Sequence, residues 1–505
     1  MKTVAASLPV SVHSTAEAGI SKEITVAHSL LALVPYHVAV EVVALPIGID
    51  ARGRLKMAMA FPSDYYSLQL LQMHTGRLVV PVAMPKKDVL NCIAVNYGDR
   101  TERSEKNTTA ATVHHPFSIN TGDTTVAIVN DIIHEAIRLR ASDIHLEPFE
   151  REMAVRFRID GVLQEIATIP RVRIPEIISR VKIMSHMDIA EKRRSQDGRI
   201  RITEQGNDVD VRVSTLPTDF GEKTVMRLLD KNGFNYNLEA MGMDAPRLAL
   251  FKKAIQQPNG IVIITGPTGS GKTTSLYAAI NFIRKPGINI STVEDPIEYN
   301  MTGVNQTQVN AATGMTFANS LRTLLRQDPD VIMVGEMRDR ETAEIAIRSS
   351  LTGHLVLSTL HTNDAPSAIT RLVDMGIEPY LVSSSVSMII AQRLVRRLCE
   401  HCKCETTVTE DIRKTLGLAS GVSLYKGLGC SACGYTGYRG RTGIYEVLPV
   451  TDHIRSLINE KAYAASIRAA AVEAGMVQLR DHALAKLVDG VTSAEEILRE
   501  ISVLA

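Results

Sequence analysis

Residues 266–273, with the sequence GPTGSGKT, constrain the fold of this chain more than any other segment. They match the eight-residue phosphate-loop pattern, follow the apolar run 261–265 and precede the helical sequence SLYAAINFI. Glycines let backbone N–H groups turn towards phosphates, a lysine adds positive charge at the β and γ groups, and a threonine hydroxyl can bind magnesium. The pattern therefore predicts a strand, a nucleotide-binding loop and a helix.

We assign nucleotide binding to the loop and the first residues of its helix. The candidate residues are Gly266, Pro267, Thr268, Gly269, Ser270, Gly271, Lys272, Thr273 and Thr274. Lys272 is the predicted phosphate ligand, and Thr273 the predicted magnesium ligand. The competing interpretation, a glycine-rich turn without chemistry, leaves the strand before the loop and the helix after it unexplained.

The region around the loop alternates short apolar runs with helical stretches. The runs are GIVIITG, NISTVED, VIMVGE and HLVLSTLH, and each ends in a glycine or a polar residue. Continuous apolar strands between helices predict a parallel sheet that is covered on both faces. Ligands of such sheets bind outside the carboxyl ends of the strands.

ATP hydrolysis needs an acidic group at a second strand end. Glu336 ends the apolar run DVIMVGE, so we predict that it activates water and that its strand lies next to the phosphate-loop strand. A surface glutamate that merely ends a strand is the alternative. Glu294 follows another run, while His354 and His361 bracket a third. Taken alone, such histidines more often serve as structural hydrogen-bonding groups.

Five of the six cysteines lie between residues 399 and 433. Cys399 and Cys402 form one C-x-x-C pair, and Cys430 and Cys433 form a second pair 27 residues further on. Four thiolates suit a closed tetrahedral zinc site. Cys404 leaves open which thiol partners Cys399.

Composition and charge disfavour several function classes. The 505 residues predict roughly three domains. Lys and Arg number 56 against 55 Asp and Glu, aromatic residues are 4% and Trp is absent, all of which disfavour nucleic-acid binding. The longest apolar stretch, 31–49, is interrupted by prolines and a glutamate, so we expect no membrane span. The first residues resemble a signal peptide only faintly, because their apolar part 4–12 is short and contains Ser7 and Pro9, so we expect no export.

Changes in pattern along the chain predict seven segments. Residues 101–125 are almost entirely polar and are the best linker candidate. The predicted segments are a loosely ordered lead 1–27, a small N-terminal domain 28–100, the linker 101–125, an α+β domain 126–233, the ATPase core 234–398, a zinc-binding subdomain 399–447 and a C-terminal helical region 448–505.

The motifs resemble those of the secretion ATPases that serve type II secretion and type IV pilus assembly. GPTGSGKTT, TVEDPIEY, LRQDPDVIMVGEMRD and GHLVLSTLHTND are similar to that family's Walker A motif, aspartate box, atypical Walker B motif and histidine box. The resemblance extends over residues 126–505. It implies an α/β fold, with a RecA-like P-loop ATPase core behind a preceding α+β, PAS-like domain.

The resemblance also implies roles for further residues. Glu294 is expected near the magnesium or the attacking water, and His361 in the histidine box of the site. Arg212 in DVRVST and Arg227 in VMRLL match arginines that approach the nucleotide in hexameric rings. Ordinary surface salt bridges are the alternative for both arginines.

The tetracysteine element resembles assembly motors rather than the shorter retraction motors. The family resemblance implies a homo-hexameric ATPase that uses ATP, Mg²⁺ and Zn²⁺ in the cytoplasm, at the inner face of the bacterial inner membrane. Its partners are then a polytopic platform protein and a docking protein that binds the N-terminal domain. Pilus assembly is favoured over type II secretion, whereas a nucleic-acid motor and a non-catalytic scaffold remain alternatives from other classes.

Overall fold

A computed structural model provides the fold and divides the chain into two compact units, residues 1–111 and 112–505. The residues that it describes are 26–97 with short gaps, 123–204, 207–230, 237–419 and 421–501. The predicted lead 1–27 and the predicted linker 101–125 lie almost wholly outside the described residues.

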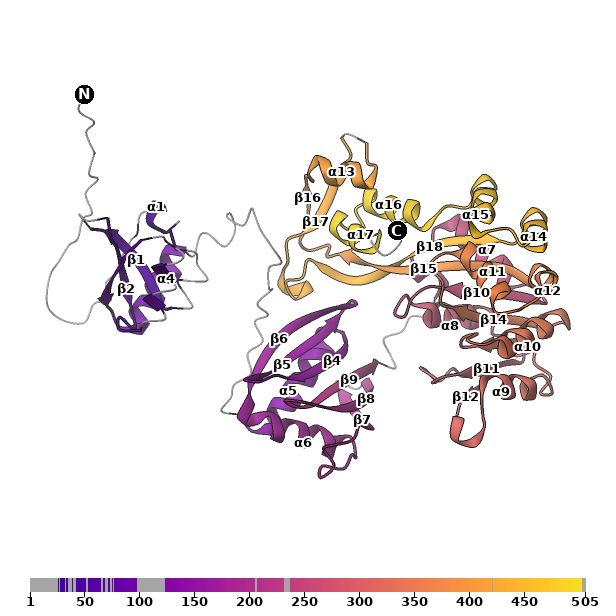
Figure 1. The fold of residues 1–505 in the computed structure, drawn as a ribbon, viewed down its shortest axis with the longest axis horizontal. Coiled ribbons are helices and arrows are strands. Elements are labelled where there is room, and N and C mark those ends of the chain that lie inside the picture. Colours follow the sequence, from indigo (N-terminus) through magenta and orange to yellow (C-terminus); the bar gives the residue numbers. More distant parts are fainter. Residues whose placement is uncertain are drawn as a thin grey trace. The chain divides into compact units, whose positions relative to one another are not determined.

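The first unit is a small α/β domain (Figure 1). Strand β1 (Ala44–Ile49) pairs antiparallel with β2 (Leu55–Met59), which pairs parallel with β3 (Val79–Ala83). Helices α1 (His28–Leu31) and α4 (Lys86–Tyr97) contact β1. Cys92 of α4 is buried in this core, as expected of a small apolar residue.

The second unit begins with the α+β domain. Its six strands form one sheet in the order β6-β5-β4-β9-β8-β7, and every pair is antiparallel. The strands are β4 (Ala141–Pro148), β5 (Glu152–Ile159), β6 (Val162–Pro170), β7 (Gln196–Glu204), β8 (Asn207–Thr218) and β9 (Gly221–Asp230). The apolar faces of helices α5 (Thr125–Arg138) and α6 (Ile174–Met184) pack with these strands in one core.

The motor domain is built on a seven-stranded sheet with the order β12-β11-β13-β14-β10-β15-β18. Its strands are β10 (Gly260–Thr265), β11 (Ile290–Glu294), β12 (Asn305–Gln308), β13 (Val331–Val334), β14 (Leu355–Leu360), β15 (Val386–Leu398) and β18 (Tyr438–Pro449). All neighbours are parallel except β15 and β18. The prediction that the Glu336 strand neighbours the phosphate-loop strand is wrong, because β14 lies between β13 and β10.

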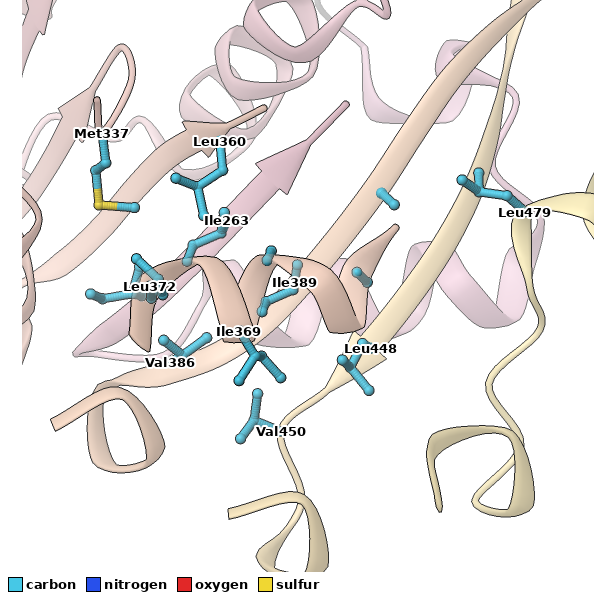
Figure 2. Packing of buried hydrophobic residues seen from close by; sticks show 14 of the residues in the cluster. Ile263, Met337, Leu360, Ile369, Leu372, Val386, Ile389, Leu448, Val450 and Leu479 are labelled. Atoms are coloured by element: carbon cyan, nitrogen blue, oxygen red, sulfur yellow. The ribbon is translucent and has the colours of Figure 1, made fainter. Parts of the chain in front are cut away.

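Both faces of this sheet are buried. Successive side chains of a strand point to opposite faces, so each strand contributes to two apolar clusters. Ile261 and Ile263 belong to one apolar cluster, whereas Val262 and Ile264 belong to another. Figure 2 shows the first cluster, in which Ile369 and other side chains of helix α11 (Ala365–Asp374) lie against strand residues. Its other helices include α9 (Phe317–Leu324), α10 (Arg340–Leu351) and α12 (Pro379–Ser385), while the second face carries α7 (Ala245–Ile255) and α8 (Lys272–Ile283).

The cysteine-rich segment is inserted between the last two strands of this sheet. It contains β16 (Lys403–Thr406), α13 (Glu410–Leu416) and β17 (Leu424–Gly427). Because β18 belongs to the motor sheet, the predicted subdomain 399–447 takes most of one motor strand with it. Cation–π packing, with Arg396 3.9 Å from the Tyr438 ring, joins the two long strands beside the insertion.

Four short helices follow the sheet, where the sequence suggested helices over 453–472 and 477–503. They are α14 (Asp452–Asn459), α15 (Ala464–Glu473), α16 (Leu479–Val488) and α17 (Ala494–Ile501). Buried Glu496 fastens α17 to β15 by accepting hydrogen bonds from Arg396 N at 3.0 Å and Arg396 Nε at 2.8 Å. None of the helices described is both long and apolar enough to cross a bilayer.

Candidate active site and cysteine cluster

The phosphate loop connects β10 to α8 at the carboxyl end of the sheet. Gly266, Gly269 and Gly271 have φ of 150°, 81° and 86°, which L side chains rarely adopt. The backbone amides at the start of α8 have no intrahelical partners, so this end of the helix suits an anion. Thr273 is exposed at this helix start. The nine predicted nucleotide-binding residues are therefore the loop 266–271 and the first three residues of α8, Lys272, Thr273 and Thr274.

Lys272 is buried within the loop that it is expected to serve. Its Nζ donates hydrogen bonds to Gly266 O at 2.8 Å and Pro267 O at 3.0 Å. Burial lowers the pKa of Lys272 to about 8, while the negative charge of Glu336 acts in the opposite direction and the cation of Arg393 adds to the lowering. The Lys272 side chain is thus held at the loop, and an incoming polyphosphate would stabilise its protonated form.

Glu336 lies just beyond the end of β13 and is bound by two side chains. Arg338 Nη2 lies 2.5 Å from Glu336 Oε1, and His361 Nε2 lies 3.2 Å from Oε2. Burial acts to raise the pKa of Glu336, but Arg338 and His361 outweigh it and hold that pKa below its usual value. Glu336 is therefore an ionised carboxylate that can accept a proton from water.

His361 and His354 bracket β14 at its two ends. His361 reaches Glu336 at the carboxyl edge, and its neighbour Thr362 bonds the last residue of β10, with Thr362 N donating to Thr265 Oγ1 at 2.8 Å. His354 instead lies at the other end of the strand, where its Nδ1 is 2.8 Å from Ser349 O. Only the first of the two histidines thus joins the candidate site.

Glu294, at the end of β11, lies inside the domain. The residue is 2% exposed, and its carboxylate accepts hydrogen bonds from the Tyr277 hydroxyl, from Thr292 Oγ1 at 2.6 Å and from Gln306 Nε2 at 3.1 Å. Tyr277 belongs to α8, so Glu294 connects the phosphate-loop helix with β11 and β12. The predicted position near magnesium or water requires these neutral donors to give way.

Arg212 and Arg227 lie opposite each other on β8 and β9. Arg212 Nη2 donates to Ile297 O at 2.8 Å, and the side chain lies 3.6 Å from Glu298. Arg227 is paired with Asp143 at 3.0 Å and is 60% exposed. In this single chain, the contacts described for the two arginines are with these groups and not with the phosphate loop.

The cysteine cluster is a second candidate site. The sulfur atoms of Cys399, Cys402, Cys430 and Cys433 all lie within 4.8 Å of one another. Three Sγ···Sγ distances are 3.8, 3.9 and 3.8 Å, whereas a tetrahedral site with Zn–S bonds of about 2.3 Å predicts about 3.8 Å. Cys404 lies in β16 outside the cluster, which answers the question of the spare thiol.

The sequence of the second unit matches a known protein family. Residues 120–499 match the family described as type II/IV secretion system protein. The chain belongs to this family of secretion ATPases. Residues 22–103 match the MshEN domain, so the N-terminal unit is also of a known type.

Curated relatives of this secretion ATPase serve two systems. Type IV pilus assembly ATPase PilB of Myxococcus xanthus is 43% identical over 500 residues, which cover 94% of this chain and 87% of PilB. Type II secretion system protein E of Pseudomonas aeruginosa is 53% identical over 376 residues, or 74% of this chain and 75% of that protein. With its family, phosphate loop and Glu336 together, the chain is an ATPase.

Solved structures support the fold of the secretion ATPase. The ATPase DotB of Legionella pneumophila aligns with a TM-score of 0.58 at 21% identity, covering 78% of this chain and all of DotB. DotB of Yersinia pseudotuberculosis aligns with a TM-score of 0.58 at 20% identity, over 79% of this chain and 100% of its own. At these identities the likeness concerns the fold, a RecA-like core.

Two polar groups of the site escaped the sequence analysis. Arg338, which holds Glu336, lies only two residues beyond it, and its place in the run GEMRD is the signal that was overlooked. Arg393 lies 120 residues beyond the phosphate loop, and no local pattern connects the two. Long-range placement of this kind requires the sheet order.

Proposed function

We propose that the chain forms a homo-hexameric ring at the cytoplasmic face of the inner membrane and powers type IV pilus assembly. ATP hydrolysis then moves a polytopic platform protein that adds subunits to the fibre. The N-terminal domain docks the ring on its membrane complex. The observation that carries the proposal is the convergence of Lys272, Glu336 and His361 at one sheet edge in a chain that matches PilB over nearly its whole length.

The chemistry follows from the residues at that edge. Lys272 and the loop amides bind the β- and γ-phosphates, and Glu336, held by Arg338 and His361, orients water and accepts its proton. Arg212 and Arg227 face the nucleotide of a neighbouring subunit, where their cations stabilise charge on the γ-phosphoryl oxygens. Both arginines exchange their present partners for phosphate in that step.

Two metals fit the residues present. Thr273 offers an exposed hydroxyl beside the loop, and oxygen ligands of this kind suit Mg²⁺, which neutralises charge on the phosphates when it is bound. Zn²⁺ fits Cys399, Cys402, Cys430 and Cys433, and there it stabilises the insertion between β15 and β18. The four cysteines lie in the segment between the end of β15 and the beginning of β18.

The first test is magnesium-dependent ATP hydrolysis by the full chain after separation by size. We expect activity in a hexamer fraction, its loss in Glu336→Gln and no stimulation by DNA. Glu344→Gln is the matched control, because Glu344 forms a surface ion pair with Arg348 at 2.7 Å on α10. Stimulation by DNA would instead support a nucleic-acid motor, and nucleotide binding without turnover in any fraction would support a scaffold.

Type II secretion is the second candidate, because the relative from that system has the higher identity. The two systems are distinguished by deleting the gene for this chain in its own bacterium. We expect loss of surface fibres with normal release of secreted enzymes. Loss of enzyme release with normal fibres would assign the chain to type II secretion instead.

A further inference from the structure

A buried arginine lies directly behind the phosphate loop. Arg393 belongs to β15, which pairs parallel with β10, and its side chain is 2% exposed. A β-carbon on Gly266, the first loop residue, would lie 2.5 Å from Gln392 O and 3.1 Å from Arg393 Nη1. Gly266 is also the residue whose carbonyl accepts the hydrogen bond from Lys272. The guanidinium is therefore packed against the loop from inside the protein.

The same guanidinium holds the segment that follows β14. Arg393 Nη2 donates to Asn363 O and to Asn363 Oδ1, both at 3.2 Å, and Nη1 donates to Gln392 O at 3.1 Å. Asn363 is two residues beyond His361, which contacts Glu336. One planar group thus contacts both the base of the phosphate loop and the backbone that carries the histidine.

The setting of Arg393 is costly for a cation. The three acceptors are neutral oxygens, and Nε is buried without a hydrogen-bond partner among the described residues. Burial lowers the pKa of the Arg393 guanidinium, although Glu500, Asp364 and Glu446 oppose this electrostatically. An apolar side chain of similar length would fill the space without this desolvation penalty. Because the buried Arg393 guanidinium costs stability, we expect it to have a role in function.

We propose that Arg393 is a positioning residue for ATP hydrolysis, which locks the phosphate loop at Gly266 to the segment at Asn363 and so places His361 on Glu336. The inference deepens the proposed function and rests on it. A misplacement of about 1 Å between reacting groups costs about 100-fold in rate. Loss of the lock therefore reduces turnover more than it reduces nucleotide binding.

The test compares full-chain Arg393→Lys and Arg393→Gln with wild type. We measure kcat and KM for ATP, and the Kd of a fluorescent non-hydrolysable ATP analogue. We expect kcat to fall about 10- to 100-fold in both variants with Kd changed by less than about threefold, since lysine keeps the charge and loses the fork. Arg397→Gln is the matched control, because Arg397 is exposed on the same strand.

A combined variant separates positioning from general packing. If Arg393 acts through His361, then Arg393→Gln in a His361→Ala background lowers kcat no further than the worse single change. Additive losses, an equal loss of nucleotide binding, or a normal kcat in Arg393→Gln each overturn the proposal. Wild-type chain that lacks turnover refutes the proposed function instead.

A surface variant keeps the test decisive if both arginine variants fail to fold. Asn363 is exposed, so Asn363→Ala removes one acceptor of the Arg393 fork without opening the core. We expect a smaller fall in kcat, with KM unchanged and the unfolding midpoint near that of wild type. An unchanged kcat in a folded Asn363→Ala protein contradicts the proposal.

Discussion

The charge state of Lys272 makes the affinity for ATP depend on pH in a calculable way. Burial lowers the pKa of this lysine to about 8 in the nucleotide-free protein. Phosphate groups beside Nζ favour the protonated form, so the bound state keeps its proton well above that pH. Above pH 8, the binding of ATP is therefore coupled to the uptake of a proton by Lys272.

The magnitude follows from the protonated fraction of the free protein. With a pKa of about 8, that fraction is about 0.9 at pH 7 and about 0.1 at pH 9. The affinity for a nucleotide should therefore fall about tenfold between these pH values, which corresponds to about 1.4 kcal/mol. An ordinary lysine pKa of about 10.4 predicts almost no change in this range.

The assay is equilibrium titration of the full chain with a fluorescent non-hydrolysable ATP analogue between pH 6.5 and about 9.5, a window chosen around the pKa of about 8. Lys272→Arg is the control, because arginine stays charged throughout and its affinity should not change with pH. A flat wild-type profile, or an equal fall in Lys272→Arg, refutes the reasoning.

The same pKa has a consequence for stability with a definite sign. A lysine whose pKa is lowered by folding destabilises the fold while it is charged, so its contribution improves as pH rises from about 8 towards the unfolded value of about 10.4. At pH 7, the change Lys272→Met relieves about 3 kcal/mol of desolvation and loses two hydrogen bonds of an ammonium group, each worth about 1.5–3 kcal/mol. We therefore expect no net gain in the stability of the nucleotide-free protein, and a higher unfolding midpoint in Lys272→Met contradicts it.

Three further predictions address other parts of the second unit. Cys430→Ser should release zinc, measured as metal per chain, whereas Cys404→Ser should retain it; equal metal content in both contradicts the site. Glu496→Ala should lower the free energy of unfolding, measured in urea, by about 3 kcal/mol, because it leaves the donors Arg396 N and Arg396 Nε without their acceptor. A loss below about 1 kcal/mol refutes this estimate. Arg227→Ala should lower turnover more than nucleotide affinity, and a normal rate would assign that arginine to its pair with Asp143.

The strands of the motor were largely predictable, because each is a short apolar run that ends in a glycine or a polar residue. The runs around Ile261, Val293, Val331 and Val356 correspond to β10, β11, β13 and β14. Their order was not predictable in the same way. Placing β13 beside β10 or one strand away gives equally acceptable right-handed crossovers, and the choice depends on packing of the whole sheet.

The long antiparallel edge escaped prediction for a different reason. Strand β18 begins with the polar and glycine-rich sequence YRGRTG, which is typical of a loop rather than a strand. It becomes a strand because β15 offers a partner over its whole length, from Met388 opposite Pro449 to Leu398 opposite Tyr438. Tertiary pairing here overrides local preference, and the cysteine insertion hides the pairing in the sequence.

The residues of the candidate site also differ in how far they could be predicted from the sequence. Lys272 and Glu336 were predictable because each belongs to a motif that is contiguous in sequence, and the motif already contains the chemistry. Some of the groups that set their charge states come from elsewhere: Arg338 belongs to the same motif as Glu336, whereas His361 comes from the end of β14 and Arg393 from β15. A pKa depends on burial and on neighbouring charges, and both are properties of the folded sheet edge. Sequence motifs therefore identify which atoms react, whereas the order of the strands decides how those atoms are charged and held.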